Sequence, residues 1–283
     1  MVLHGKYSST TLIKNYFLMA YIRAKKGLGQ HFLIDNNIAE KIVNSLHANE
    51  ADTVVEIGPG TGVLTKFLLK KNFSGFCAVE IDEESVAFLK KNFPEVSDKL
   101  ILADFMKLNF SETFKGTTAI IGNLPYFISS QIFFKILENR FQVNEAICMI
   151  QKEVAERISA PPGSRTYGIL SVLLQAWYKI EYLFTVHEHV FSPPPKVKSG
   201  VIRLVRNNVM KLECDEKLFF QVVKTAFNQR RKTLRNSLKS MISGEAVAVP
   251  LFDLRPERLS VDDFVILTNL IEKFNNSNHA NCI

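Results

Sequence analysis

The sequence has few cysteines, one tryptophan and no long apolar segment. Cys77, Cys148, Cys214 and Cys282 form no Cys-x-x-Cys pair, so neither a zinc site nor a disulfide framework is indicated. No window holds the roughly 18 consecutive apolar residues that a membrane-spanning helix needs. A reducing cytoplasm is therefore the expected location.

Basic residues outnumber acidic ones in the chain. Its 283 residues include 35 Lys and Arg against 28 Asp and Glu, which gives a net charge of +7. A composition of 47% apolar and 22% charged residues is typical of a folded protein and not of a disordered one. The positive surplus favours polyanionic partners where it gathers on one surface.

The chain divides into three parts by composition. Residues 1–24 contain Lys and Arg but no acid, and we expect a disordered extension, with a transit peptide as the alternative. Residues 25–207 alternate strand-like and helix-like segments, and residues 208–283 contain only helix-like ones. We therefore expect a larger α/β domain followed by a small all-helical C-terminal domain.

Short apolar runs alternate with amphipathic stretches between residues 52 and 150. Such alternation is typical of a parallel sheet covered by helices on both faces, a Rossmann-like α/β fold. The predicted strands are Thr53–Ile57, Phe76–Glu80, Lys99–Ala103, Ala119–Gly122 and Ala146–Ile150. The predicted helices are an amphipathic stretch ending at Lys71, then Glu83–Asn92, Ser129–Glu138, Asp215–Asn228, Arg230–Ser243 and Ser260–Phe274.

A glycine-rich turn follows the first predicted strand. Gly58, Gly60 and Gly62 come directly after an acidic residue and the strand end, where glycine permits a tight bend and close approach of a ligand. The dinucleotide pattern Gly-x-Gly-x-x-Gly would require a glycine at position 63, which is Val63. This excludes an NAD-dependent dehydrogenase and favours the turn that methyltransferases use.

Two carboxylates end the next two predicted strands. Glu80 lies where an acid can accept the ribose hydroxyls of a nucleoside, and Asp104 lies where one can accept adenine N6 protons. Either acid alone reads equally well as a solvated strand end. Together with Gly58 and Gly60, they place ligand groups at three successive strand ends, which indicates a nucleoside site.

The segment Asn123-Leu124-Pro125-Tyr126 follows the fourth predicted strand. An adenine amino group is a poor nucleophile because its lone pair is delocalised into the ring. Acceptors on both N–H groups, namely the Asn123 side chain and the Leu124 carbonyl, would aim that lone pair at a methyl donor. Tyr126 would stack on the base and hold it in place.

With these motifs in place, the sequence resembles the bacterial small-subunit (16S) ribosomal RNA adenine N6,N6-dimethyltransferases from about residue 25 to residue 259. The resemblance implies a seven-stranded class I methyltransferase sheet with one antiparallel edge strand. It also implies S-adenosylmethionine as the cofactor, and a product with two adjacent dimethylated adenosines. Four further stretches of sequence carry the resemblance: residues 29–33 (GQHFL), 151–154 (QKEV), 191–197 (FSPPPKV) and 226–238 (AFNQRRKTLRNSL).

The resemblance also implies roles for single residues. The family places an Asn and a Leu against the cofactor; His31 replaces that Asn here, while Leu33 matches. Asn123 belongs to both the cofactor-binding and the catalytic set. Phe191 matches an aromatic that closes the other face of the target adenine, its alternative being a core phenylalanine. Apart from the resemblance, small Gly122 and the open strand rim would leave room for a first methyl group.

A basic run lies in the C-terminal part. Residues 217–244 contain seven basic residues and no acid, with Arg230, Arg231, Lys232 and Arg235 within six positions. This density indicates a phosphate-binding surface on small-subunit rRNA, and the alternative is a solvated helix face. The expected substrate is a partly assembled small subunit, a pre-30S particle, bound by a monomer.

Two rival functions and one rival site remain. A macrolide-resistance methyltransferase would share the sheet and the Asn-x-Pro-Tyr loop but act on large-subunit RNA, and a non-catalytic assembly factor would keep the fold alone. The basic run argues against the first, and intact Asn123, Pro125 and Tyr126 argue against the second. His187-Glu188-His189 has no third metal ligand nearby, so we expect no metal there.

Overall fold

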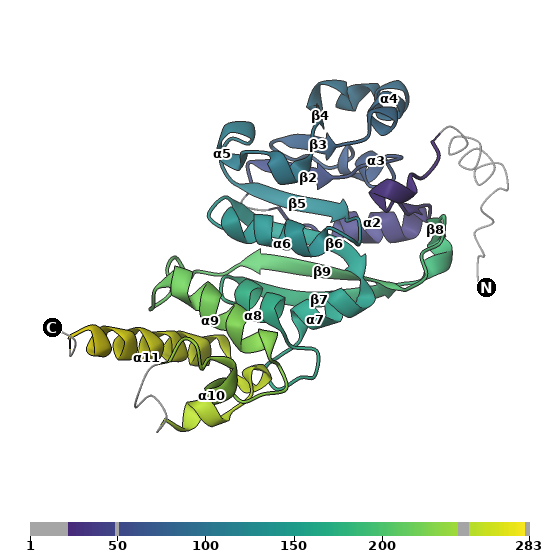
Figure 1. Ribbon diagram of the computed structural model, residues 1–283. Helices are drawn as coiled ribbons and strands as arrows, with labels where there is room; N and C mark the ends of the chain where they lie inside the picture. The colour runs from purple at the N-terminus through teal and green to yellow at the C-terminus, as the bar shows by residue number, and fades with distance from the viewer. Residues whose placement is uncertain (1–21, 49–50, 243–248, 281–283) are drawn as a thin grey trace, which may run out of the picture.

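The computed structural model describes residues 22–48, 51–242 and 249–280. A seven-stranded sheet in the order β4-β3-β2-β5-β6-β9-β7 forms its centre (Figure 1). Almost all of the predicted extension, residues 1–21, lies outside the described residues. The sheet strands are β2 (Thr53–Ile57), β3 (Phe76–Glu80), β4 (Leu100–Leu102), β5 (Thr118–Asn123), β6 (Val143–Gln151), β7 (Tyr178–Val186) and β9 (Ser199–Arg206).

Five neighbouring strands, β4, β3, β2, β5 and β6, run parallel, as the sequence predicted. The structure confirms the predicted bounds of β2 and β3, while β4 is shorter than expected and β5 and β6 are longer. Ile57 pairs with Val79 on one side and with Gly122 on the other. The carboxyl ends of β2, β3 and β5 therefore lie at nearly the same level.

Strand β9 runs antiparallel to both of its neighbours, β6 and β7. It follows β7 through a loop and not through a crossover helix, so the two strands run in opposite directions. The expected count of seven strands is confirmed, but the antiparallel strand lies one position in from the edge and not at the edge. A separate two-stranded sheet pairs β1 (Phe32–Leu33) with β8 (Phe191–Ser192).

Helices cover both faces of the sheet. One hydrophobic cluster joins the sheet to α6 and α8 and to two later helices, α9 (Glu216–Asn228) and α11 (Val261–Ala280). A second cluster joins the sheet to α2 and α3. The predicted bounds of α4 and α6 are confirmed, while α3 is only one turn long. The helices before residue 207 are α2 (Asn36–Asn44), α3 (Thr65–Leu68), α4 (Glu83–Asn92), α5 (Phe110–Thr113), α6 (Ser129–Glu138), α7 (Lys152–Ser159) and α8 (Ile169–Gln175).

The segments after residue 207 are helical and gather beyond the β7 edge of the sheet (Figure 1). They include α9 (Glu216–Asn228), α10 (Leu234–Ser237) and α11 (Val261–Ala280). The prediction of a continuous helix over residues 230–243 was wrong. The chain turns after Gln229, and α10 is the helix that forms in the described part of this stretch, up to residue 242. Two long-range contacts hold that turn, with Arg230 donating to the carbonyl oxygen of Arg165 and Arg235 pairing with Asp253.

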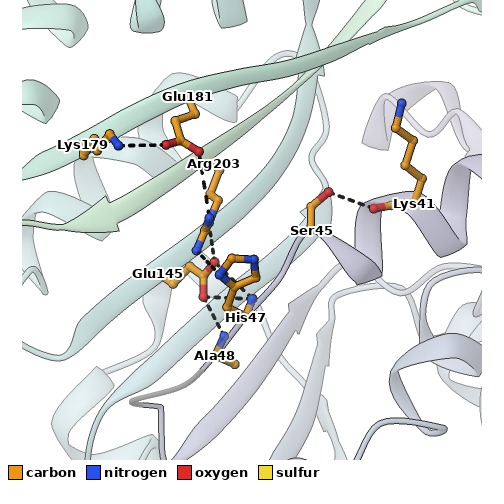
Figure 2. A network of polar contacts seen from close by, with 8 residues as sticks. All are labelled: Lys41, Ser45, His47, Ala48, Glu145, Lys179, Glu181 and Arg203. Carbon is orange, nitrogen blue, oxygen red and sulfur yellow. Dashed lines mark hydrogen bonds and ion pairs between the residues drawn. The ribbon is translucent and has the colours of Figure 1, made fainter.

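Buried Glu145 joins α2 to the sheet at the end opposite the carboxyl ends of the parallel strands. Its carboxylate accepts from the backbone amide of Ala48 at 2.7 Å and from Arg203 Nε at 2.7 Å. Arg203 also contacts His47 Nδ1 at 2.7 Å, and Glu181 lies at the outer side of the network (Figure 2). Glu145 is 5% exposed, so its charge depends on these partners.

Replacing Glu145 with alanine should destabilise the fold strongly. The change removes the carboxylate 2.7 Å from the Arg203 guanidinium, which is 17% exposed, and leaves it with the more distant Glu181 at 3.9 Å. Breaking a buried pair from one side costs about 3 kcal/mol or more of unfolding free energy. Lys179→Ala is the control, because Lys179 is 76% exposed in its pair with Glu181 and should change stability by about 1 kcal/mol or less. Urea unfolding of both variants measures this, and equal losses would contradict it.

Candidate active site

A cavity of about 390 Å³ opens at the carboxyl ends of β2, β3, β4 and β5. Its walls come from residues 27–32, the turn after β2, the residues that follow β3 and β4, and residues 123–128. Its size is that of a small-molecule site, and its position is the edge where open parallel sheets bind ligands. Five segments that are distant in sequence therefore meet around one space.

The glycine turn after β2 has the predicted conformation. Gly58, Gly60 and Gly62 all have positive φ angles, of 63°, 54° and 77°. A Cβ on Gly60 would lie 2.9 Å from the ring of Phe32, and one on Gly62 would lie 2.5 Å from that of Phe93. A Cβ on Gly58 would meet no atom within 4 Å, and this residue lines the cavity. The turn thus needs glycine for its shape and opens at Gly58 for a ligand.

Glu80 lines the cavity and is 4% exposed. Its carboxylate accepts from the backbone amides of Gly60 at 3.0 Å, Ile81 at 2.9 Å and Asp82 at 3.0 Å. Burial raises the pKa of the carboxyl group, and these three amides oppose that rise. A carboxylate has about four acceptor positions, so one remains for a ligand in this geometry. The predicted bond to both ribose hydroxyls would require the Gly60 amide to give way.

Asp104 lines the cavity at the start of the short 3-10 helix η3 (Phe105–Lys107). One carboxylate oxygen caps η3 by accepting from the amide of Met106 at 2.9 Å. This bond fixes the direction of the side chain at the carboxyl end of β4, and the second oxygen is the group available to a ligand. The structure thus brings Asp104 to the same cavity as Glu80 and Gly58.

Asn123 is the last residue of β5, and the N-terminal segment orients its side chain. Nδ2 donates to the main-chain carbonyl oxygen of His31 at 2.9 Å, which assigns Oδ1 as the acceptor of the side-chain amide. The next residue, Leu124, donates its amide to the carbonyl oxygen of Met149 at 3.0 Å. Both predicted acceptor residues line the cavity on a backbone that neighbouring strands hold.

Tyr126 lies on the cavity wall with its hydroxyl 2.7 Å from that of Ser199 on β9. Burial raises the pKa of this phenol, and nearby Glu188 adds to the rise. The ring of His31 stacks near Tyr126 at a centroid distance of 5.7 Å, and its Nδ1 donates to the carbonyl oxygen of Pro193 at 2.8 Å. Tyr126 is therefore held at its hydroxyl, and His31 lines the cavity beside it.

Leu33 and Phe191 do not reach the cavity. They pair with each other across β1 and β8, are 1% and 3% exposed, and belong to the hydrophobic cluster beneath α2 and α3. Neither residue lines the cavity, whereas Phe32, between His31 and Leu33, does. For Phe191 this arrangement agrees with the alternative, a core phenylalanine, and a contact with the target base stays a prediction.

Gly122 has a different role from the one expected. A Cβ there would lie 2.6 Å from the carbonyl oxygen of Ile57 and 3.1 Å from the side chain of Leu124. The space beside Gly122 is thus filled by β2 and does not open into the cavity. Glycine at this position allows the close approach of β5 to β2 and gives no room to a methyl group.

Several cavity residues were not predicted from the sequence. The most prominent is Phe127, which is 61% exposed at the cavity wall. Its only sequence signal is its position directly after Tyr126. Met106, Gln131, Gly27 and Leu28 also line the cavity without a local pattern that marks them, whereas Gly29 and Gln30 belong to the stretch 29–33 already singled out. Buried Glu56 lies next to the glycine turn but is not among the lining residues; burial raises its pKa to about 8, and Thr65 donates to it at 2.7 Å.

The basic run does not form one charged helix face. Arg231 and Lys232 are exposed in the turn between α9 and α10, whereas Arg230 bonds to a backbone carbonyl and Arg235 to Asp253. Arg231 and Lys232 thus stand out as the solvent-facing pair of the four predicted residues.

Neither a metal cluster nor a membrane-spanning helix is found within the described part of the chain. Over residues 22–48, 51–242 and 249–280, no group of three His, Cys, Asp or Glu side chains is placed to hold a metal ion. The rings of His187 and His189 lie 5.9 Å apart, tilted by 31°, in the loop after β7. In the same ranges no helix is long and apolar enough to cross a membrane.

The sheet order and the cavity at its carboxyl edge define a class I methyltransferase fold. A dimethyladenosine transferase from Plasmodium falciparum has a similar structure, with a TM-score of 0.72 and 26% identity over 88% of this chain and 98% of that one. The 23S rRNA methyltransferase ErmE has the same fold, with a TM-score of 0.65 and 22% identity over 85% of this chain and 99% of its own.

The sequence identifies the family. The chain belongs to the ribosomal RNA adenine dimethylase family, whose model matches residues 22–273. It is 55% identical to ribosomal RNA small subunit methyltransferase A of Parabacteroides distasonis, over 90% of this chain and 96% of that protein. Identity to the protein of the same name from Cytophaga hutchinsonii is 56%, over 89% of this chain and 99% of that one. The family resemblance inferred from the motifs is thereby confirmed.

Proposed function

We propose that this chain transfers methyl groups from S-adenosylmethionine to N6 of two adjacent adenosines near the 3′ end of small-subunit ribosomal RNA, giving N6,N6-dimethyladenosine. Membership of the adenine dimethylase family supports the reaction, and the printed names of relatives that are about 55% identical support the small-subunit substrate. The observation that carries the proposal is the orientation of Asn123, whose amide oxygen is fixed as an acceptor at the cavity.

The cavity fits the nucleoside part of the cofactor. Gly58 offers open space beside its backbone, and the remaining acceptor position of Glu80 suits a ribose hydroxyl. The second carboxylate oxygen of Asp104 suits an adenine amino group. When bound, S-adenosylmethionine supplies an electrophilic methyl group on a sulfonium. These three residues would hold it at the edge of the sheet.

Asn123 and Leu124 would act on the target amine. The Asn123 side-chain oxygen and the Leu124 carbonyl accept its two N–H groups and so turn the nitrogen lone pair out of the ring plane. Tyr126, held by Ser199, stacks on the base and fixes its distance from the methyl donor. Catalysis then consists of positioning and requires no strong base.

The same arrangement permits a second transfer. A monomethylated amine keeps one N–H for Asn123 or Leu124 to hold and one lone pair to aim. Because Gly122 is packed against β2, the room for the first methyl group must come from the open side of the cavity. Reaching the adjacent adenosine requires the RNA to shift between transfers, which a grip on phosphates allows.

The remaining parts of the proposal concern the partner and the setting. Residues 25–207 form the methyltransferase domain and residues 208–283 a helical RNA-binding domain. The substrate is a pre-30S particle, since a defined RNA shape must present the loop, and the enzyme acts on it as a monomer in the cytoplasm. The rival functions are methylation of large-subunit RNA and a non-catalytic role in assembly. The likeness to ErmE supports the shared fold and does not favour the first rival.

The substitutions Asn123→Ala and Glu80→Ala should separate turnover from cofactor binding. Asn123→Ala should abolish methyl transfer and leave the dissociation constant of S-adenosylmethionine near that of the wild type. Glu80→Ala should weaken cofactor binding about ten- to a hundredfold, because a hydrogen bond to a charged group is worth about 1.5–3 kcal/mol. Calorimetry and a methyl-transfer assay measure the two effects.

Thermal unfolding of both variants serves as the control, since Glu80 also holds the turn at Gly60. Near-normal methylation by Asn123→Ala would rule out the proposed role of its amide. Unchanged cofactor affinity in a folded Glu80→Ala protein would remove Glu80 from the binding site.

The product identifies the substrate. Unmethylated small subunits treated with the enzyme and S-adenosylmethionine should yield two neighbouring N6,N6-dimethyladenosines near the 3′ end of their RNA, as mass spectrometry of nuclease fragments will reveal. Large subunits treated in parallel should gain no methyl groups. Methylation confined to large-subunit RNA would favour the first rival, and no methylation of either would favour the second.

The exposed pair Arg231 and Lys232 should contribute to RNA affinity through phosphates. Changing both to serine should weaken binding and reduce the slope of log affinity against log salt by about 0.7–0.9 for each lost phosphate contact. Lys70→Ser with Lys71→Ser is the matched control, because these exposed lysines follow α3, which packs on the opposite face of the sheet. An equal slope for both double variants would make the basic run a solvated surface.

A further inference from the structure

Phe127 occupies an unusual position for a large apolar residue. It follows Tyr126 in the loop between β5 and α6 and lines the same cavity, but its side chain is 61% exposed. Tyr126 is half-buried and bonded through its hydroxyl, so the two consecutive rings differ in their surroundings. Both rings line the cavity, and the high exposure of Phe127 puts its ring at the solvent side of that lining.

The ring of Phe127 lies against Gly29 in the N-terminal segment. It packs against the backbone of Gly29, where a Cβ would lie 2.8 Å from Cδ1 and 2.9 Å from Cε1 of the ring. Gly29 has a φ of 59°, a conformation that further favours glycine. A residue with a side chain at position 29 would displace the ring, so the contact fixes the ring and leaves much of it exposed to solvent.

The backbone that carries Phe127 is also fixed. The amide of Ile128 donates to the carbonyl oxygen of Pro125 at 3.2 Å, and Ser129 Oγ donates to the carbonyl oxygen of Tyr126 at 3.0 Å. Helix α6 begins at Ser129. An exposed ring on a rigid turn loses little conformational freedom when a flat ligand stacks on it, which makes it a suitable binding surface.

We propose that Phe127 is the stacking platform for the base of the nucleotide next to the target adenosine. The inference rests on the proposed function and adds a residue that determines substrate binding. When the target base enters the cavity beside Tyr126, its neighbour remains attached through one phosphodiester and loses a stacking partner. Phe127, at the opening, replaces that partner, since aromatic side chains stack on unpaired RNA bases.

The competing role for Phe127 is to cover the cofactor. Gly29 follows the short 3-10 helix η1 (Lys26–Leu28), and Lys25 at its start bonds to Asp82 beside Glu80. If the ring served only to hold this segment over the cavity, its loss would weaken cofactor binding and leave RNA binding unchanged. The two roles therefore predict opposite patterns of binding constants.

The first experiment measures Phe127→Ala and Phe127→Trp on unmethylated small subunits. Phe127→Ala should raise KM about five- to a hundredfold, the range given by the loss of one stacked base, with kcat and the cofactor dissociation constant near wild-type values. Phe127→Trp should restore KM. Phe141→Ala is the matched control, because Phe141 is 55% exposed just before the amino end of β6, away from the cavity, and should change nothing.

The second experiment tests the contact itself with RNA hairpins that carry one target adenosine. The neighbouring nucleotide is either adenosine or an abasic residue, placed on each side in turn, and binding is measured directly. Wild-type protein should lose about five- to a hundredfold in affinity for the abasic RNA on one side, and Phe127→Ala should lose none. Such coupling requires the ring and the base to interact.

Equal losses for both proteins with the abasic RNA would overturn the proposal, as would an unchanged KM for Phe127→Ala. Weaker cofactor binding with an unchanged KM would overturn it in favour of the covering role. These outcomes are distinct from a failure of the proposed function, because that failure would appear as an absence of dimethyladenosine in wild-type product. A wild-type enzyme that makes the product without coupling at Phe127 would reject the inference alone.

Discussion

The register of the parallel strands β3, β2 and β5 is the constraint on which the site depends. Ile57 pairs with both Val79 and Gly122, so the next residue along each of the three segments lies at the same level. That level holds Gly58, Glu80 and Asn123, the residues assigned to the cofactor and the target amine. The approach is close because Gly122 has no Cβ to collide with the Ile57 carbonyl. A slip of one residue would turn each of these side chains to the other face of the sheet.

A second constraint comes from the N-terminal segment, whose residues 27–32 line the cavity. The short β1–β8 pair anchors it, and the main-chain carbonyl of His31 then fixes the Asn123 amide. Because a main-chain group makes this bond, the orientation of Asn123 does not depend on the side chain at position 31. The substitution of His for the family's Asn therefore leaves the orientation of the Asn123 side chain intact. What it alters is the cavity wall beside Tyr126, where the imidazole now stacks.

Local sequence patterns predicted the parallel half of the fold well, because buried strands and capped helices carry their signal within a few residues. The bounds of β2, β3, α4 and α6 agree with the structure, as does the conformation of the glycine turn. Features that depend on distant contacts were missed. Residues 230–243 look helical by composition, but bonds to Arg165 and Asp253 hold a turn there. Phe191 is buried through pairing with Leu33, which lies 158 residues earlier in the chain.

The arrangement separates chemistry from RNA affinity while holding the two at a fixed spacing. The groups proposed to act on the amine lie on β5 and its loop, and the exposed basic pair lies beyond α9. One continuous hydrophobic cluster runs from Ile120 on β5 through Trp177 to Phe219 on α9 and Phe264 on α11. Close-packed interiors transmit position with little compliance, so under the proposed function a phosphate held near Arg231 would determine which nucleotides can reach the cavity. Selection of the target would then follow from the shape of the RNA between the phosphate near Arg231 and the base in the cavity. The cavity itself would need to recognise only an adenine amino group.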